Sequence, residues 1–323
     1  MKQNTEQLQP YTAAYKHRIA KKFIGPLCRT FLMVCLTFVI LYPLLYMVSM
    51  AFRPLADVYD PHVFWVPTSL TLENIKMTVK DLDYFSLLWH TAYISIVSTA
   101  IQLIVTVLTG YAFGRFDFWF KKLWLVLVVL TMVVPMQLIT LPTYHSFTNL
   151  DFFGIIQAIT GKPSGLSIVG SPLTLFILAA FGQGIRSGLF ILIFMQTFKS
   201  MPRELEEAAL VDGAGSFRTF VSVMLPNAGT AAVVVGLLSV IWYWNDYYIT
   251  DIFSGSAYPT LSTTLAVIRS AFGHSMGSAT YDAYQMIVLE QSAALLTILP
   301  LLILYILTQR KFCESVERVG IVG

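Results

Sequence analysis

Charge is scarce in this 323-residue chain, of which Asp, Glu, Lys and Arg make up only 12% and hydrophobic residues 56%. A soluble globular domain carries about a quarter charged residues, so this composition excludes an ordinary water-soluble fold. Cysteine is also scarce: the three cysteines form no CxxC pair and no metal-ligand spacing. Neither a disulfide framework nor a zinc site is therefore expected.

Two common motifs of nucleotide and metal chemistry are missing as well. No Gly-rich loop is followed by Lys-Ser or Lys-Thr, so the chain is not expected to bind a nucleoside triphosphate itself. No HExxH occurs, and no histidine has a metal-ligand partner at helical spacing. We therefore expect a non-catalytic chain that holds no cofactor or metal of its own.

Long apolar stretches are abundant. A helix needs about 20 residues to cross the hydrocarbon core of a bilayer, and six stretches reach that length, five of them without any Asp, Glu, Lys or Arg and one interrupted by Arg186. The fold class predicted is an all-α integral membrane protein with six transmembrane helices, the fourth broken near Arg186. The predicted spans are about 31–51, 86–113, 123–142, 172–198, 230–252 and 286–309.

Positive charge lies in alternate loops. Lys and Arg gather before the first predicted span, around Lys121, within 199–218 and after the last span, whereas residues 53–83 are acidic. Cytoplasmic loops carry the excess of Lys and Arg, so we predict a multi-pass protein with both termini in the cytoplasm. Residues 1–28 are predicted as a cytoplasmic tail and residues 29–323 as the membrane domain.

One face of the second predicted span is polar. Its six hydroxyl or amide side chains are three or four residues apart, which places them on one helical face: Thr91, Ser95, Ser98, Gln102, Thr106 and Thr109. Small polar residues let helices pack closely in lipid, but a polar face can also line a pathway for solute. The sequence leaves both interpretations open.

Polar residues also occur in the fourth and fifth predicted spans. Trp242 shares a helical face with Asn245 and Asp246, and an aromatic ring beside an amide and a carboxylate could bind a sugar. For Trp244 and the tyrosines beside it, the simpler interpretation is an aromatic belt at the membrane boundary. An arginine within a span is either functional or reaches out to the interface. The candidate pathway residues are Ser95, Ser98, Gln102, Arg186, Trp242, Asn245 and Asp246.

The densest acidic cluster lies in the segment MPRELEEAALVDGAGSFRTFVSVMLP, residues 201–226. Ser200 is predicted as the N-cap of a short helix, whose glutamates suit the positive end of the helix dipole, and Gly213 is predicted to end it in a left-handed turn. A second helical face is predicted from Phe217 to Met224. Helices that lie on a bilayer favour Lys and Arg, so this alanine-lined acidic helix is expected to insert into a groove on a soluble partner.

This segment resembles the EAA loop of permease subunits in bacterial ATP-binding-cassette (ABC) importers. The family pattern is Glu-Ala-Ala, three residues, Gly, nine residues and Ile-x-Leu-Pro; Glu207-Ala208-Ala209, Gly213 and Leu225-Pro226 match it, with Val223 in place of Ile. The stretches TGYAFGRFDFWFKK, VPMQLITLPTYHSFTNLDFFG, WNDYY and FCESVERVGIVG are similar to maltose-type (MalG-like) carbohydrate permeases. The resemblance covers roughly residues 30–323.

The resemblance implies a type I importer permease with the MetI-like fold, forming half of a sugar pathway in the bacterial inner (plasma) membrane. The implied partners are a homologous permease, two ATPase subunits that bind ATP and Mg, and an extracytoplasmic sugar-binding protein that contacts the segment after Tyr258; no nucleic acid is expected. The coupling loop, residues 200–226, would engage the ATPase through Glu204, Glu207, Ala208, Ala209, Asp212, Gly213, Leu225 and Pro226. The alternative is a self-contained secondary transporter or channel, which would need no docking helix.

Overall fold

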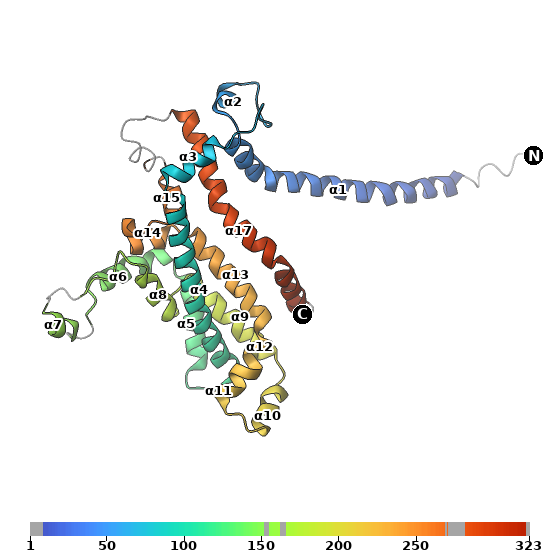
Figure 1. Cartoon of the computed structure of the whole chain (residues 1–323). Coiled ribbons are helices and arrows are strands. Elements are labelled where there is room, and N and C mark those ends of the chain that lie inside the picture. The colour runs from blue at the N-terminus through green and yellow to red at the C-terminus, as the bar shows by residue number, and fades with distance from the viewer. Residues whose placement is uncertain (1–8, 152–154, 162–165, 269, 271–281, 321–323) are drawn as a thin grey trace, which may run out of the picture. The chain divides into compact units, whose positions relative to one another are not determined.

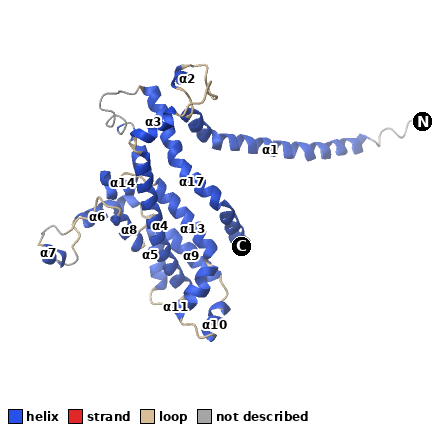
Figure 2. Cartoon of the chain, viewed as in Figure 1, coloured by secondary structure: helices blue, strands red, loops and turns tan. Residues whose placement is uncertain are grey.

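The computed structural model describes residues 9–151, 155–161, 166–268, 270 and 282–320. Within these ranges the chain is helical and contains no β-strand (Figure 2); one isolated bridge joins Leu150 to Leu166. The all-α prediction is therefore confirmed. The chain divides into two compact units, the first made of Met1–Ile75 with Ala283–Leu295 and the second of Lys76–Asp282 with Leu296–Gly323.

The first unit contains α1 (Gln9–Ala51), α2 (Leu55–Tyr59) and the starts of α3 (Glu73–Asp81) and α17 (Ala283–Gly320). Helix α1 begins inside the predicted cytoplasmic tail and continues through the first predicted span. The most apolar 18-residue window of its part Gly25–Ala51 contains no buried residue, and burial begins only at the end of the helix, at Met50 and Ala51. A surface this apolar and this long requires a non-aqueous environment, as the membrane prediction expects.

The second unit contains the remaining helices, and Figure 1 shows α5, α9 and α13 beside the long helix α4. The elements are α4 (Tyr84–Arg115), α5 (Lys121–Val133), α6 (Met136–Thr148), α7 (Ile155–Thr160), α8 (Leu173–Ala180), α9 (Ser187–Ser200), α10 (Glu204–Val211), α11 (Ser216–Thr219), the π-helix η1 (Phe220–Met224), α12 (Leu225–Asn227), α13 (Gly229–Asn245), α14 (Tyr248–Ser254), the 3₁₀-helix η2 (Gly255–Ala257) and α15 (Leu261–Ala266).

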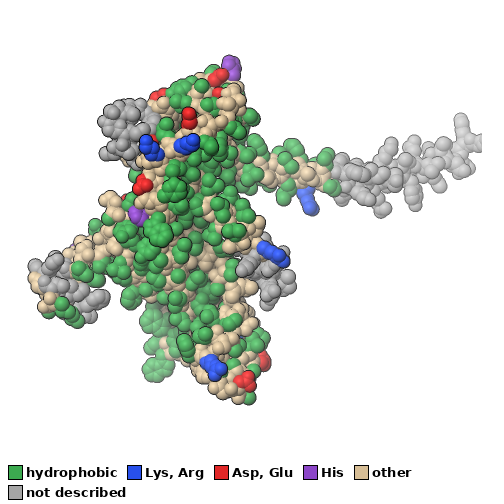
Figure 3. All heavy atoms as spheres, in the orientation of Figure 1, with side chains coloured by type: hydrophobic (Ala, Val, Ile, Leu, Met, Phe, Trp, Pro, Cys, Tyr) green, Lys and Arg blue, Asp and Glu red, His purple; other side chains and the backbone are tan. Residues whose placement is uncertain are grey.

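Helix α4 packs against α9 at very short range. A Cβ atom at Gly110 would collide with the Cβ of Phe194 and would lie 2.9 Å from the backbone N of Met195. Phe194 and Phe198 of α9 are fully buried in the aromatic core at this contact. Small residues bring helix backbones together in lipid, so α4 and α9 form one closely packed pair. The outer face of the bundle in view is mostly hydrophobic, with a few charged side chains at the end that carries α10 (Figure 3).

The predicted number of six spans is not confirmed. Among the described residues, three single helices are long and apolar enough to cross a membrane: Gly25–Ala51, Tyr84–Arg115 and Ala283–Arg310. Two bent pairs raise the number to five if each counts as one span: Lys121–Val133 with Met136–Thr148, bent by 100°, and Ser216–Asn227 with Gly229–Asn245, bent by 73°.

Three predicted spans differ from straight helices. The third bends at Pro135, which has no N–H to donate to a continuing helix and stands in extended backbone before α6. The fourth is broken into α8 and α9, as predicted, with Arg186 at φ 60° in the left-handed region. The fifth was predicted to reach residue 252, but α13 ends at Asn245 and α14 begins at Tyr248.

Candidate functional site

The predicted acidic helix is α10, between α9 and α11. It begins at Glu204, later than the sequence predicts. Ser200 is not its N-cap, because the Ser200 hydroxyl donates to the carbonyl O of Thr197 at 2.8 Å and so belongs to the last turn of α9. Arg203 precedes the first residue of α10, and no side chain caps this helix.

The end of α10 is a Schellman motif, as the glycine in the sequence predicts. Gly213 has φ +81°, which a residue with a Cβ adopts only at a cost. Its N–H donates to Leu210 O, and the N–H of Ala214 donates to Ala209 O, each at 3.0 Å. These two bonds satisfy the last carbonyls of the helix, so α10 stops within one residue and the chain turns sharply into α11.

The predicted coupling residues of α10 lie on its exposed side, with one exception. Glu204, Glu207 and Ala208 are exposed, as are Asp212 and Gly213 in the turn. Ala209 is the exception: it is 9% exposed and packs inward. Val211, which the prediction omits, is 87% exposed. The exposed side of α10 therefore carries two carboxylates next to small and apolar side chains, a surface on which a partner could lie close to the helix backbone.

The second half of the segment is a helical run of three parts, α11, η1 and α12. Phe220 and Met224 are buried in the core, whereas Phe217 is 78% exposed and Val221 43% exposed. The predicted apolar face is therefore confirmed for Phe220 and Met224 and wrong for Phe217 and Val221, which lie outside the core. The π-helix explains the difference, because the N–H of Leu225 donates to Phe220 O five residues earlier and the wider turn rotates the face. Leu225 is half-buried, and Pro226 after it is exposed.

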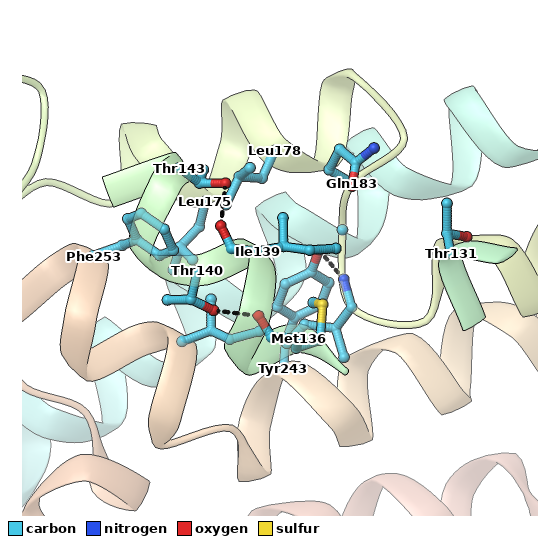
Figure 4. A pocket seen from close by; sticks show the side chains of 13 residues that line it. Thr131, Met136, Ile139, Thr140, Thr143, Leu175, Leu178, Gln183, Tyr243 and Phe253 are labelled. Carbon is cyan, nitrogen blue, oxygen red and sulfur yellow. Dashed lines mark hydrogen bonds between the residues drawn. The ribbon is translucent and has the colours of Figure 1, made fainter. Parts of the chain in front are cut away.

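A cavity of about 380 Å³ lies where three helix breaks of the second unit meet (Figure 4): α5–α6, α8–α9 and α13–α14. It is mainly apolar, with hydroxyl groups from three threonines and Tyr243. Its lining includes Thr131, Thr140, Thr143, Gln183, Tyr243 and Phe253. The Tyr243 hydroxyl accepts the N–H of Ile185 at 3.3 Å and so holds the α8–α9 break against α13.

A second cavity of about 680 Å³ shares lining residues with the first and adds three of the predicted pathway residues, Arg186, Trp242 and Asp246. The guanidinium carbon of Arg186 lies 5.7 Å from the centre of the Trp242 ring, which is a cation–π distance. Trp242 in turn stacks on Phe190 at 5.3 Å. The cavity lining therefore includes a cation, Arg186, held against the aromatic ring of Trp242.

Asp246 and Asn245 have local structural roles. The Asp246 carboxylate accepts the N–H and the hydroxyl of Thr250, both at 2.8 Å, and so caps the start of α14. Asn245 is exposed, donates to Ile241 O at 2.9 Å and lines neither cavity. Trp244 is not part of an aromatic belt: it is 6% exposed, and its ring N–H donates to Thr297 O at 3.0 Å.

The polar face of α4 is a packing surface. Ser95, Ser98 and Gln102 have no exposed area within the chain and line neither cavity. The amide of Gln102 donates to Ile185 O at 2.8 Å and to Ser187 Oγ at 2.7 Å, and it accepts the Ser239 hydroxyl at 2.7 Å. Within this chain these three side chains pack against neighbouring helices, as the packing alternative describes; their role in a pathway stays a prediction.

The sequence analysis missed the residues that line the smaller cavity, and two signals mark where they lie. Pro135 inside the third predicted span indicates a break, as does the pair Gly182 and Gly184 beside Arg186. The burial of the polar face around Gln102 could not be predicted from the sequence, because the spacing of polar residues along one helix does not show which other helix packs against them.

Two further features bear on catalysis. Residues 273–277 read GHSMG, which matches the GxSxG pattern of serine hydrolases, but that pattern acts on a turn between a strand and a helix. The segment lies outside the described residues, and the described ranges hold no strand. Among the described residues, no cluster of His, Cys, Asp and Glu could hold a metal ion.

Known proteins similar to this chain are transport permeases. The arabinooligosaccharides transport system permease protein AraQ of Halalkalibacterium halodurans is 24% identical over 89% of this chain and 93% of its own length. The probable starch degradation products transport system permease protein AmyC of Thermoanaerobacterium thermosulfurigenes is also 24% identical, with the same coverage.

A solved structure shares the fold. It is the crystal structure of a bacterial ABC transporter involved in the import of the acidic polysaccharide alginate, and one of its chains matches with a TM-score of 0.68 and 19% identity over 91% of this chain and 98% of that one. The predicted importer-permease fold is confirmed. The family model of binding-protein-dependent transport system inner membrane components matches residues 106–311. By this match, which spans most of the second unit and includes the whole α10 segment, the chain belongs to that family of multi-pass inner membrane transport permeases.

Proposed function

We propose that this chain is one of two homologous permease subunits of an ATP-driven importer of neutral oligosaccharides. In this complex α10 docks on one of two ATPase subunits, which bind the ATP and Mg. An extracytoplasmic binding protein delivers the sugar. Both termini and α10 lie on the cytoplasmic side. The chain itself catalyses no reaction, and its cavities at the helix breaks form part of the pathway.

The observation that carries the coupling role is the exposed side of α10. A helix of eight residues is too short to be stable alone in water, and α10 is nevertheless ended by a complete Schellman motif and presents Glu207, Ala208 and Val211 outward. The alanine allows close approach, and the carboxylate can pair with a basic group on the partner. A channel or secondary transporter would have no use for this helix.

The sugar assignment is supported by the relatives and by the chemistry of the cavities. Three of the matched proteins are named for arabinooligosaccharides, starch degradation products and diacetylchitobiose, and the matched solved structure is named for the polysaccharide alginate. The larger cavity is lined by Trp242, whose ring already lies against Arg186 and Phe190. The smaller one adds threonine hydroxyls that can accept hydrogen bonds from a sugar. Arg186 lies against Trp242, and Asp246 is committed to capping α14.

Co-purification tests the assembly. The full chain, tagged at one terminus and extracted gently from native membranes, should bring with it a second permease, an ATPase and a binding protein. Replacement of Gly213 by Asp should remove the ATPase from the preparation while the second permease remains. If the unmodified chain purifies alone and still moves solute in vesicles, the coupling role is wrong and the secondary-transporter alternative holds.

Uptake by cells tests the cargo. A strain that lacks this chain would be compared with a complemented strain for uptake of radiolabelled arabino-oligosaccharides, maltodextrins and diacetylchitobiose. We expect one of these to enter only the complemented strain. Equal uptake of all three by both strains, in cells whose complex assembles normally, would overturn the assignment to these oligosaccharides while leaving the coupling role intact.

A further inference from the structure

Tyr111, Arg115 and Glu206 form a polar cluster where the end of α4 meets α10. The Nε of Arg115 lies 3.4 Å from Oε1 of Glu206, and the Tyr111 hydroxyl donates to the same oxygen at 3.0 Å. Through Nη2, Arg115 also donates to the carbonyl O of Met201 at 2.8 Å and of Pro202 at 3.3 Å. The end of α4 therefore holds both a carboxylate of α10 and the chain that leads into α10.

This cluster is shielded from solvent. The Arg115 side chain is 5% exposed, that of Glu206 is 20% exposed, and Tyr111 is buried. A buried ion is costly unless a partner and hydrogen bonds satisfy it. Here the opposite charges face each other without a hydrogen bond at Arg115 Nε, and the hydrogen bonds come from the Tyr111 hydroxyl to Glu206 and from Arg115 Nη2 to the two carbonyls. Consecutive side chains of a helix point about 100° apart, which is why Glu206 faces α4 while Glu207 next to it is exposed.

Helix α4 connects this cluster to the cavities. The Tyr111 ring packs against Phe198 of α9 and Phe220 of η1, with ring centres 5.2 and 4.8 Å apart. Gln102, on the same unbroken helix, bonds to the α8–α9 break that lines both cavities. At a rise of 1.5 Å per residue, α4 spans about 20 Å between Gln102 and Arg115.

We propose that Tyr111, Arg115 and Glu206 are a clamp that makes α10 and α4 move as one body, so that displacement of the docked helix reaches the cavities through α4. The proposal rests on the coupling role of α10, and it adds that α4 transmits the movement of α10 to the cavities. The three are positioning residues, because each acts on another part of this chain and none lies on the exposed side of α10.

Distance measurements by pulsed electron paramagnetic resonance test the clamp without knowledge of the cargo. The three cysteines, Cys28, Cys35 and Cys313, are first replaced by serine in the full chain. Spin labels are then placed at Leu108 on α4 and at Leu210 on α10, which is not one of the proposed docking residues; these side chains are 46% and 53% exposed. The complex with its ATPase is measured in lipid nanodiscs, without nucleotide and after trapping with ATP and vanadate.

With the clamp intact, the distance between the two labels should be the same in both states. The double variant Tyr111→Phe and Glu206→Gln keeps the ring and the size of the side chain but loses the hydroxyl and the charge, so it should fold. In this variant we expect the distance to shift on trapping and its distribution to broaden, and the ATP hydrolysed per solute molecule moved to rise several-fold. Asp117→Asn, which removes an exposed ion pair to Lys121, is the matched control and should behave as the unmodified chain does.

Two results would overturn the clamp: a distance that already shifts on trapping in the unmodified chain, or a double variant with the same fixed distance as the control. Failure of the coupling role itself looks different, since the ATPase would then be absent from the labelled complex before any distance is compared. The two failures are therefore distinguishable in one preparation.

Discussion

Replacing Gln102 by Leu should destabilise the second unit by about 3 to 5 kcal/mol. The side chain has no exposed area and makes three hydrogen bonds, to Ile185 O, Ser187 Oγ and the Ser239 hydroxyl. Side-chain hydrogen bonds in membrane proteins average about 0.6 kcal/mol, so three give about 2 kcal/mol. The carbonyl of Ile185 is also left unpaired, and a buried unpaired group adds about 1–3 kcal/mol.

The assay is unfolding by titration with SDS in mixed micelles, followed by tryptophan fluorescence. Gln137→Leu is the matched control: Gln137 is exposed, and exposed substitutions stay within about 0.5 kcal/mol. Hydrogen exchange gives a second readout, because amides at the start of α9, from Ser187 to Phe190, should exchange faster when Gln102 no longer holds the break. An equal free energy of unfolding for the two leucine variants, with unchanged exchange at Ser187, would refute the role of Gln102.

Three further substitutions follow from single features of the structure. Gly213→Asp places a Cβ at φ +81°, at a local cost of about 1–2 kcal/mol; uptake should be lost while the amount of chain in the membrane, measured by immunoblot, stays normal. Gly110→Ala should cost about 1–3 kcal/mol through overpacking against Phe194, whereas Gly236→Ala, whose Cβ would lie 3.4 Å from a flexible leucine, should be within about 0.5 kcal/mol in the same SDS titration. Trp242→Ala should lower uptake at least several-fold without changing the recovery of the ATPase by co-purification, and unchanged uptake would remove Trp242 from the pathway.

The class of the protein and its coupling segment were predictable from the sequence because their signals are local. Hydrophobic length alone predicts membrane helices, and α1, α4 and α17 carry the required stretches. The end of α10 at Gly213 follows from the conformational freedom of one residue. The exposed carboxylates of α10 also follow from local pattern, since they share a short helix with alanines that tolerate a close partner.

Errors arose where a second element decides the outcome. Ser200 has the chemistry of an N-cap, but α9 continues through it and its hydroxyl is used there. Ser95 and Ser98 have the spacing of a pathway face, and only the tertiary structure shows that neighbouring helices of this chain cover both side chains. Trp244 is a residue type typical of a membrane boundary, yet it is buried. Asp246 lines the larger cavity, as a pathway residue would, but it also caps α14.

By itself, the sequence determined that this chain is a multi-span helical membrane protein with a short, glycine-ended acidic helix, because apolar length and turn chemistry are properties of contiguous residues. Only the tertiary structure decided that Gln102 holds the α8–α9 break, that the cavities form where three breaks meet, and that Glu206 turns toward Arg115 while Glu207 is exposed. The physical reason is that burial and hydrogen-bond partners depend on groups brought together from distant positions: 95 residues separate Tyr111 from Glu206.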